Sequence, residues 1–193
     1  MASLVINADA DTYLQYNAPT TNYGSSNTNL LYGWDGANYT RMLLKAPLSS
    51  IPIQAKISAA ILSIYNESTG AGTQNVTLYR VLKNWVEAQA TWNIYSSGNN
   101  WASAGCNSAG VDRAVAAIGS LAINNTAEWK HISLDLTELA LLRASNYGMV
   151  IVPADTVPRY IRTKEYASYI PYLTITYSMP VHTAAYLSDF GVI

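Results

Sequence analysis

The feature that most constrains the fold is a succession of short β-strand patterns separated by clusters of turn residues. The clearest pattern is 172–177, in which Tyr172, Thr174 and Thr176 face one way and the intervening residues face the other. Turn clusters at 20–27 and 68–73 are rich in Asn, Gly, Ser and Thr, which accept positive φ or bond their own backbone. Strands are expected at 4–7, 12–16, 29–34, 41–46, 57–65, 76–82, 130–134, 149–152, 160–164 and 172–177.

This succession predicts an all-β protein, an antiparallel jelly-roll β-sandwich with one or two short helices and a C-terminal extension. One helix is expected at 135–143, where Asp135 can cap the N-terminus and Arg143 lies in the last turn. A second helical turn is expected at 84–87. The sandwich module is expected to span 1–178, followed by a C-terminal arm at 179–193, because Pro180 and a nearly uncharged tail follow the final strand.

The low charge of the chain excludes several classes of protein. Charged residues make up 12% of the 193 residues, and 11 Lys and Arg against 12 Asp and Glu leave a net charge of −1. Nucleic-acid-binding proteins carry a clustered cationic surplus and disordered chains are rich in charge, so neither class fits. No stretch approaches the ~20 consecutive apolar residues of a membrane helix, so no membrane insertion is expected. The single cysteine, Cys106, cannot form a disulfide within the chain.

The aromatic residues are unevenly distributed among types. The chain has 15 Tyr and 5 Trp but a single Phe. Tyr and Trp combine an apolar ring with a polar group, so this mixture favours surfaces that contact a hydrated partner.

The N-terminal segment predicts the compartment in which the chain folds. It has no basic region and no apolar run of signal-peptide length before Asp9. We therefore expect synthesis and folding in a reducing cytosol.

An ordered set of short motifs runs along the predicted strands. The set begins with Asp-Ala-Asp-Thr-Tyr at 9–13 and continues with Arg-Met-Leu-Leu-Lys at 41–45, Tyr-Arg-Val at 79–81 and Ala-Thr-Trp-Asn at 90–93. It closes with Pro-Tyr-Leu-Thr-Ile at 171–175. In this order the motifs resemble the DNRLRE family, the disaggregatase-related modules that are also classed as carbohydrate-binding modules. The resemblance covers about residues 8–178, and Ala46-Pro47 departs from the Phe-Asp that is usual after the Leu-Leu-Lys strand.

The resemblance implies a jelly-roll β-sandwich that serves as a non-catalytic appendage of secreted enzymes and surface proteins, or as part of a phage virion. Here the module makes up almost the whole sequence and no signal peptide precedes it, which favours a virion component assembled in the host cytosol. The leading hypothesis is therefore a virion accessory protein, either a capsid decoration (cement) protein or a head- or tail-fibre protein. Such a protein would stabilise the particle or mediate adhesion to the host surface.

The expected partners of such a protein are its own subunits, as a trimer or dimer, and a major capsid or tail protein. A host-surface glycan is a further possible partner, and the expected location is the virion, with an extracellular location as the alternative. The C-terminal arm is the expected assembly contact because an apolar end is costly to leave in water. Its candidate contact residues are Val181, His182, Tyr186, Leu187, Phe190 and Ile193.

The alternative hypothesis is a carbohydrate-binding module that binds a polysaccharide. A sugar site needs an aromatic face for stacking, with amide and hydroxyl groups around it. Two loop segments supply such residues, and the candidate carbohydrate-binding residues are Trp34, Asp35, Tyr39, Trp92, Tyr95 and Trp101. These aromatic rings could instead cover the core or an interface, and Trp85 and Trp92 are expected to plug one end of the sandwich.

Cofactor and catalytic signals are weak. Asp9 and Asp11 could supply oxygen ligands to Ca²⁺, with Asn, backbone carbonyl groups or Glu165 completing the set, and no other cofactor is expected. The carboxylates are scattered, and His131 and Cys106 lack the neighbours of a known catalytic motif. The chain is therefore expected not to be an enzyme.

Overall fold

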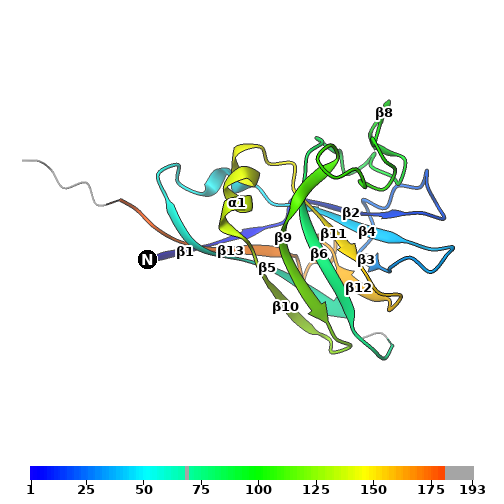
Figure 1. The fold of residues 1–193 in the computed structure, drawn as a ribbon. Helices are drawn as coiled ribbons and strands as arrows, with labels where there is room; N and C mark the ends of the chain where they lie inside the picture. The colour runs from blue at the N-terminus through cyan, green and yellow to red at the C-terminus, as the bar shows by residue number, and fades with distance from the viewer. Residues whose placement is uncertain (68–69, 181–193) are drawn as a thin grey trace, which may run out of the picture.

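The protein is an antiparallel β-sandwich, seen in a computed structural model that describes residues 1–67 and 70–180 (Figure 1). One sheet, here called sheet A, has the strand order β1-β13-β5-β12-β3, and β10 pairs with the opposite edge of β5. Its strands are β1 (Ala2–Asn7), β3 (Thr28–Leu31), β5 (Lys56–Glu67), β10 (Glu128–Ser133), β12 (Arg159–Arg162) and β13 (Tyr172–Ser178).

The second sheet, sheet B, has the strand order β2-β4-β11-β6-β9. Its strands are β2 (Ala10–Gln15), β4 (Thr40–Lys45), β6 (Gln74–Val81), β9 (Arg113–Ile123) and β11 (Met149–Pro153). From β1 to β6, each successive strand lies in the other sheet, so neighbours within a sheet are distant in sequence. This alternation is the jelly-roll arrangement that the sequence predicts.

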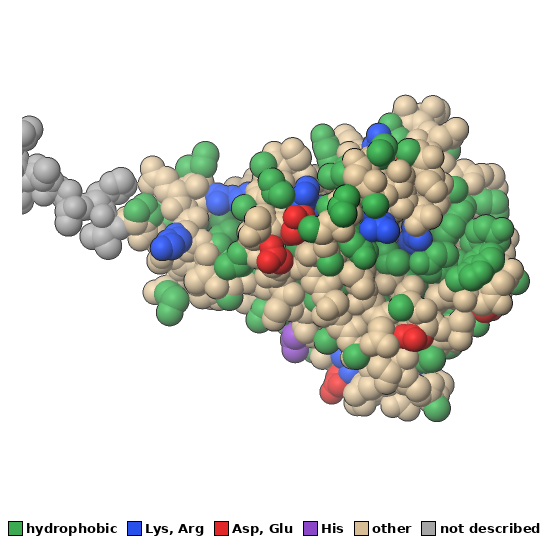
Figure 2. All heavy atoms as spheres, viewed as in Figure 1, with side chains coloured by type: hydrophobic (Ala, Val, Ile, Leu, Met, Phe, Trp, Pro, Cys, Tyr) green, Lys and Arg blue, Asp and Glu red, His purple; other side chains and the backbone are tan. Residues whose placement is uncertain are grey.

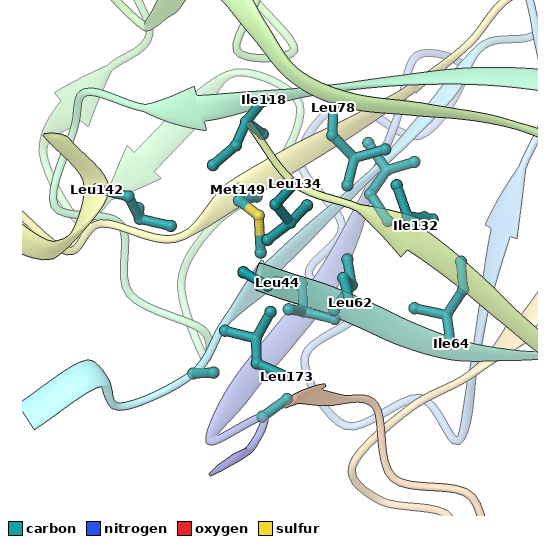
Figure 3. Close-up of a cluster of buried hydrophobic side chains, with 14 of the residues drawn as sticks. Leu44, Leu62, Ile64, Leu78, Ile118, Ile132, Leu134, Leu142, Met149 and Leu173 are labelled. Atoms are coloured by element: carbon teal, nitrogen blue, oxygen red, sulfur yellow. The ribbon is translucent and has the colours of Figure 1, made fainter. Parts of the chain in front are cut away.

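The main core fills the space between the two sheets (Figure 3). Alternation along the strands aims every second side chain inward, so Leu62 and Ile64 of β5 face Leu44 of β4 and Leu78 of β6 across the sandwich. These four side chains are fully buried. Burial of such residues at about 25 cal/mol per Å² of apolar surface is the main stabilising contribution to the fold.

A second buried cluster lies on the outer face of sheet B. The segment 82–112, which includes the short hairpin of β7 (Ile94–Ser96) and β8 (Asn99–Asn100), covers this face and brings three indole rings to it. Trp85, Trp92 and Trp101 are 2%, 7% and 4% exposed and pack in the cluster with Leu43 and Val150 of the sheet. Trp85 and Trp92 are buried as predicted, but they pack on the outer face of sheet B and do not plug one end of the sandwich.

The predicted helix at 135–143 is confirmed as α1 (Leu136–Ala144), which lies at one end of the sandwich (Figure 1). Asp135 is its N-cap and accepts a hydrogen bond from the backbone N–H of Glu138 at 2.8 Å. The Glu138 carboxylate in turn pairs with Arg80 of β6 at 2.6 Å, which ties the helix to sheet B.

The prediction of a helical turn at 84–87 is wrong. Asn84, Trp85 and Val86 have no regular secondary structure, and the Trp85 indole instead donates a hydrogen bond to the Tyr147 carbonyl at 2.7 Å. Burial of this ring fixes the local backbone more strongly than helix propensity does. The second short helix is a single 3-10 turn, η1 (Leu48–Ser50).

The predicted module boundary coincides with the end of β13 at Ser178, and the predicted arm residues Val181, His182, Tyr186, Leu187, Phe190 and Ile193 lie outside the described residues. Within the described part of the chain, no helix is both long and apolar enough to cross a membrane.

Candidate functional site

The most exposed tryptophan of those predicted to bind sugar is Trp34, in the loop that joins β3 to β4. Its side chain is 51% exposed, and Tyr16, at the end of β2, is 45% exposed beside it. The two rings meet edge to face, with their centroids 4.9 Å apart and their planes at 87°. Figure 2 shows hydrophobic side chains gathered at the end of the molecule where the turns beside β2 and β4 lie in Figure 1. We call the five residues Tyr16, Asn17, Trp34, Asp35 and Asn38 the Trp34 surface.

Hydrogen bonds within the β3–β4 loop hold Trp34 in place. The Asp35 carboxylate accepts bonds from the backbone N–H groups of Ala37 and Asn38 at 2.8 and 2.6 Å, and from the Asn38 side-chain amide at 3.0 Å. The chain turns at Gly36, whose φ of 97° favours glycine. These bonds to the ionised form hold the pKa of Asp35 below its usual range, so this side chain is an anion at neutral pH.

Two asparagine amides connect the β3–β4 loop to the end of β2. Asn17 donates from its side-chain amide to the Asn38 Oδ1 at 2.6 Å, and Tyr16 donates from its backbone N–H to the Tyr39 carbonyl at 2.9 Å. Asn17 is exposed and Asn38 is half-buried. The Trp34 surface therefore combines an exposed indole, a phenol, two amides and a carboxylate.

Tyr39 lies beneath the Trp34 surface and connects it to the buried cluster. Its ring centroid is 5.7 Å from that of Trp92 and 4.7 Å from the guanidinium carbon of Arg41. Arg41 is buried and donates to the Gly105 carbonyl at 2.6 Å and to Asn107 Oδ1 at 2.8 Å. The rings of the surface thus rest on a packed and hydrogen-bonded support.

Only some of the predicted sugar-binding residues belong to the Trp34 surface. Trp34 and Asp35 belong to it, whereas Tyr39 and Trp92 lie in the supporting layer, where the ring centroid of Trp92 is 5.6 Å from that of Tyr16. Because Trp92 is buried under Tyr16, Tyr39 and the backbone of Gly105, it has no free face for a sugar ring.

Tyr95 and Trp101 form a separate pair, with ring centroids 5.4 Å apart. The Trp101 indole is buried and donates to the Thr91 carbonyl at 3.0 Å, so it too cannot stack on a sugar. The structure therefore corrects the prediction that Trp92 and Trp101 stack on a sugar. Both rings are buried against the outer face of sheet B, where their large apolar area supports the fold.

The two aspartates predicted as calcium ligands have different environments. Asp9 is exposed, whereas Asp11 is 1% exposed and both of its carboxylate oxygens accept hydrogen bonds within the chain. The donors are the Asn29 side-chain amide at 3.1 Å and the Lys164 backbone N–H at 2.8 Å. Among the described residues, no three His, Cys, Asp or Glu side chains are grouped so that they could hold a metal ion. Calcium binding stays a prediction.

Asp11 belongs to a group of charged side chains that joins three segments of the chain. Glu87 accepts from the Asp11 backbone N–H at 2.7 Å, and the Lys164 ammonium contacts Glu87 at 3.3 Å and Glu165 at 2.5 Å. Burial, with a smaller contribution from the charges of Glu165 and Glu87, raises the pKa of Asp11 to about 7, although the Lys164 backbone hydrogen bond lowers it. The positive charge of the Lys164 ammonium therefore balances part of the negative charge of Glu87 and Glu165.

The fold is that of a small β-sandwich module with an exposed aromatic surface beside the turns of β2 and β4. The family model for carbohydrate-binding module family 96 matches residues 2–110, which is more than half of the chain and contains the whole Trp34 surface. The chain belongs to carbohydrate-binding module family 96. None of the curated proteins compared with the chain matches it significantly.

This membership confirms the coarser part of the sequence-based resemblance, that the chain is of a carbohydrate-binding-module family. Modules of this kind are typically non-catalytic, and the expectation that this chain is not an enzyme stays a prediction. The comparisons give no support to a virion or capsid role.

Sequence reasoning missed Tyr16, Asn17 and Asn38 as members of the candidate surface. Tyr16 ends the strand predicted at 12–16, Asn17 follows it, and Asn38 lies in a loop segment rich in aromatic and polar residues, so a polar residue beside each turn was the available signal. What the sequence lacked was the pairing of β2 with β4, which places Gln15 opposite Thr40 and brings the two turns together.

Proposed function

We propose that the protein is a non-catalytic module that binds a polysaccharide at the Trp34 surface. The observation that carries this proposal is the 51% exposed Trp34 ring, held by its loop and by Tyr16 among amide and carboxylate groups. Membership of a carbohydrate-binding-module family supports the same class of ligand.

The chemistry of the Trp34 surface suits a sugar ring. The C–H face of a pyranose packs on an indole, while its hydroxyl groups need donors and acceptors at the ring edge. Asn17 and Asn38 supply both kinds of group, and the ionised Asp35 supplies a strong acceptor.

Preorganisation raises the affinity that such a small surface can reach. The backbone and side-chain bonds of the β3–β4 loop fix Trp34 before a ligand arrives, so little conformational entropy is lost on binding. The Tyr39, Trp92 and Arg41 layer below keeps the rings from turning inward.

The experiment is affinity electrophoresis of the full chain in gels that contain xylan, β-glucan, galactomannan, alginate or chondroitin sulfate. The wild-type protein should be retarded by at least one polysaccharide, and Trp34→Ala should weaken that retention by about thirtyfold, equivalent to about 2 kcal/mol for a central aromatic contact. Trp34→Phe should keep much of the retention because it keeps a stacking face.

A matched control is Val115→Ala, which removes another exposed apolar side chain, 74% exposed on β9. This variant should migrate as the wild type does. Equal retention of the wild type and Trp34→Ala, with both proteins folded by circular dichroism, would place the ligand elsewhere.

The virion accessory role, with self-assembly and a capsid or tail partner, stays a prediction. Its candidate contacts lie in the arm outside the described residues, and a glycan site at the Trp34 surface is compatible with it, because a particle can adhere to its host through surface sugars. The virion and extracellular locations likewise stay predictions.

A further inference from the structure

A second group of aromatic side chains lies on the outer face of sheet A. Tyr65 of β5 stacks on Tyr169 with ring centroids 3.9 Å apart, and Trp129 of β10 meets Tyr65, Tyr169 and Tyr172 at 5.6, 6.1 and 5.0 Å. Tyr166 continues the group at 5.8 Å from Tyr169. We call these five residues the Trp129 surface. All five side chains are half-buried.

Strand pairing creates the Trp129 surface. Trp129 is paired directly with Tyr65 on neighbouring strands, which lie beside each other in Figure 1. Ile64 and Leu173, the chain neighbours of Tyr65 and Tyr172, are buried in the main core, so the two tyrosines face outward. The connection 163–171 joins β12 to β13, which pair with the edge of β5 opposite to β10, and it adds Tyr166 and Tyr169.

Polar side chains border the aromatic rings in the pattern that a sugar requires. The Arg162 guanidinium lies 3.6 Å from the Tyr166 ring centroid and is ion-paired with Glu67. Two residue pairs along the sheet from Trp129 and Tyr65, and on the same face, the exposed His131 imidazole is hydrogen-bonded to Ser63 Oγ at 2.9 Å.

On the other side of the surface, the exposed Asn7 of β1 is paired with Tyr172. A guanidinium, an imidazole, a hydroxyl and an amide therefore lie around one aromatic group.

The residue types on this face point to a ligand as well as to packing. A cap that served only to cover the sheet could use Leu or Phe, yet all five members are Tyr or Trp, whose polar groups favour a hydrated contact. The cation–π, ion-pair and ring contacts hold the group in one arrangement, so binding would order few side chains.

We propose that the Trp129 surface is a second glycan-binding site, at which an extended segment of a polysaccharide stacks on Trp129 and Tyr172. This proposal takes its class of ligand from the proposed function. The Trp129 surface, however, consists of different residues, and all of them except Tyr65 lie outside residues 2–110, which the family model matches. Strand β10 is separated from β3 by β5 and β12, three strand spacings or about 14 Å, so the two surfaces are distinct. One module could then hold a polysaccharide at two places, which increases avidity without any new contact.

The test compares variants of the full chain in the same polysaccharide gels and by calorimetry with oligosaccharides of the retarding polysaccharide. Trp129→Leu removes the stacking face while filling much of the space, and Trp129→Phe restores a face. We expect Trp129→Leu to weaken retention about three- to tenfold, Trp129→Phe to recover most of it, and Trp34→Ala with Trp129→Leu to weaken it more than either change alone. Calorimetry should give two oligosaccharides per wild-type chain and one for each single variant.

The outcomes separate this proposal from the proposed function. If Trp34→Ala loses retention while Trp129→Leu and Trp129→Phe both bind as the wild type does, the second site is refuted and the first stands. If the wild type is retained by none of the polysaccharides, both are refuted. Thermal melting of each variant identifies loss of fold, and Tyr172→Ser provides an independent change on the same surface that must weaken retention in the same direction.

Discussion

The buried carboxylate of Asp11 should make the stability of the fold depend on pH, and Asp11→Asn should remove that dependence. In the wild type, Asp11 accepts from the Asn29 side-chain amide and from the Lys164 backbone N–H. Asn29 Oδ1 and Glu165 Oε2 are buried acceptors without a hydrogen-bond partner among the described residues. A neutral Asp11 can donate to such an acceptor. An asparagine at this position keeps the shape: its Oδ1 can accept from the Lys164 backbone N–H, and its amide can donate to Asn29 Oδ1 once the Asn29 side-chain amide turns over.

The sign and size of the effect follow from the pKa. Burial, the first cause, raises the pKa of Asp11 from 3.8 in an unstructured chain to about 7 in the fold. The folded state therefore holds a proton that the unfolded state releases between these two values, and stability increases as the pH falls through about 7 and stops increasing near 3.8. At ~1.36 kcal/mol per pKa unit, the wild type should gain about 2–3 kcal/mol from this group between about pH 8 and about pH 5.

The measurement is the free energy of unfolding by urea at several pH values for the wild type and Asp11→Asn. The difference between the two proteins should change by about 2–3 kcal/mol across this range, with the variant as stable as the wild type or more stable at about pH 8. A difference that stays constant with pH would refute the reasoning. A change of the opposite sign would show that the carboxylate is stabilised as an anion in the fold.

Two further changes test the packing of segment 82–112 and the aspartate pair. Gly105→Ala should destabilise the fold by about 2–3 kcal/mol in urea unfolding, because φ is 77° and the new Cβ would lie 2.6 Å from the Trp92 ring. Gly98→Ala is the matched control, since its φ is 76° with open space around it, and it should cost about 1 kcal/mol; equal losses would contradict the close approach at Gly105. If Asp9 and Asp11 bind calcium as the sequence predicts, millimolar Ca²⁺ should raise the Tm of the wild type but not that of Asp11→Asn, and an unchanged wild-type Tm would contradict that prediction.

Much of the sandwich was predictable because its strands alternate cleanly. The segment 172–177 became β13, and the Asp135 cap fixed the start of α1 within one residue. By contrast, β9 was missed because its sequence from Arg113 to Ile123 contains four Ala and one Gly, which have low strand propensity, and pairing with β6 determines its structure. Local patterns carry no information about such tertiary pairing.

The candidate site was predictable only in part for the same reason. Residue type identified Trp34 and Asp35 correctly as members of one loop, but it could not separate an exposed indole from the buried Trp92 and Trp101. That distinction depends on segment 82–112 folding over sheet B, and on hydrogen bonds such as Asn17 to Asn38 between residues 21 positions apart.

The pairing of β1 with β13 has a mechanical consequence. The register from Ala2 opposite Tyr177 to Asn7 opposite Tyr172 puts the start of β1 beside the end of β13, at the end of the molecule away from the turns beside β2 and β4 (Figure 1). Hydrogen bonds between antiparallel strands run perpendicular to the strands, so tension applied between Ala2 and Ser178 opens them one after another, at low force. A load that enters at Ala2 and leaves at the Trp34 loop runs instead along the strands, in shear, and is shared by many bonds at once. The module should therefore withstand a higher force between Ala2 and a polysaccharide bound at the Trp34 loop than between Ala2 and Ser178.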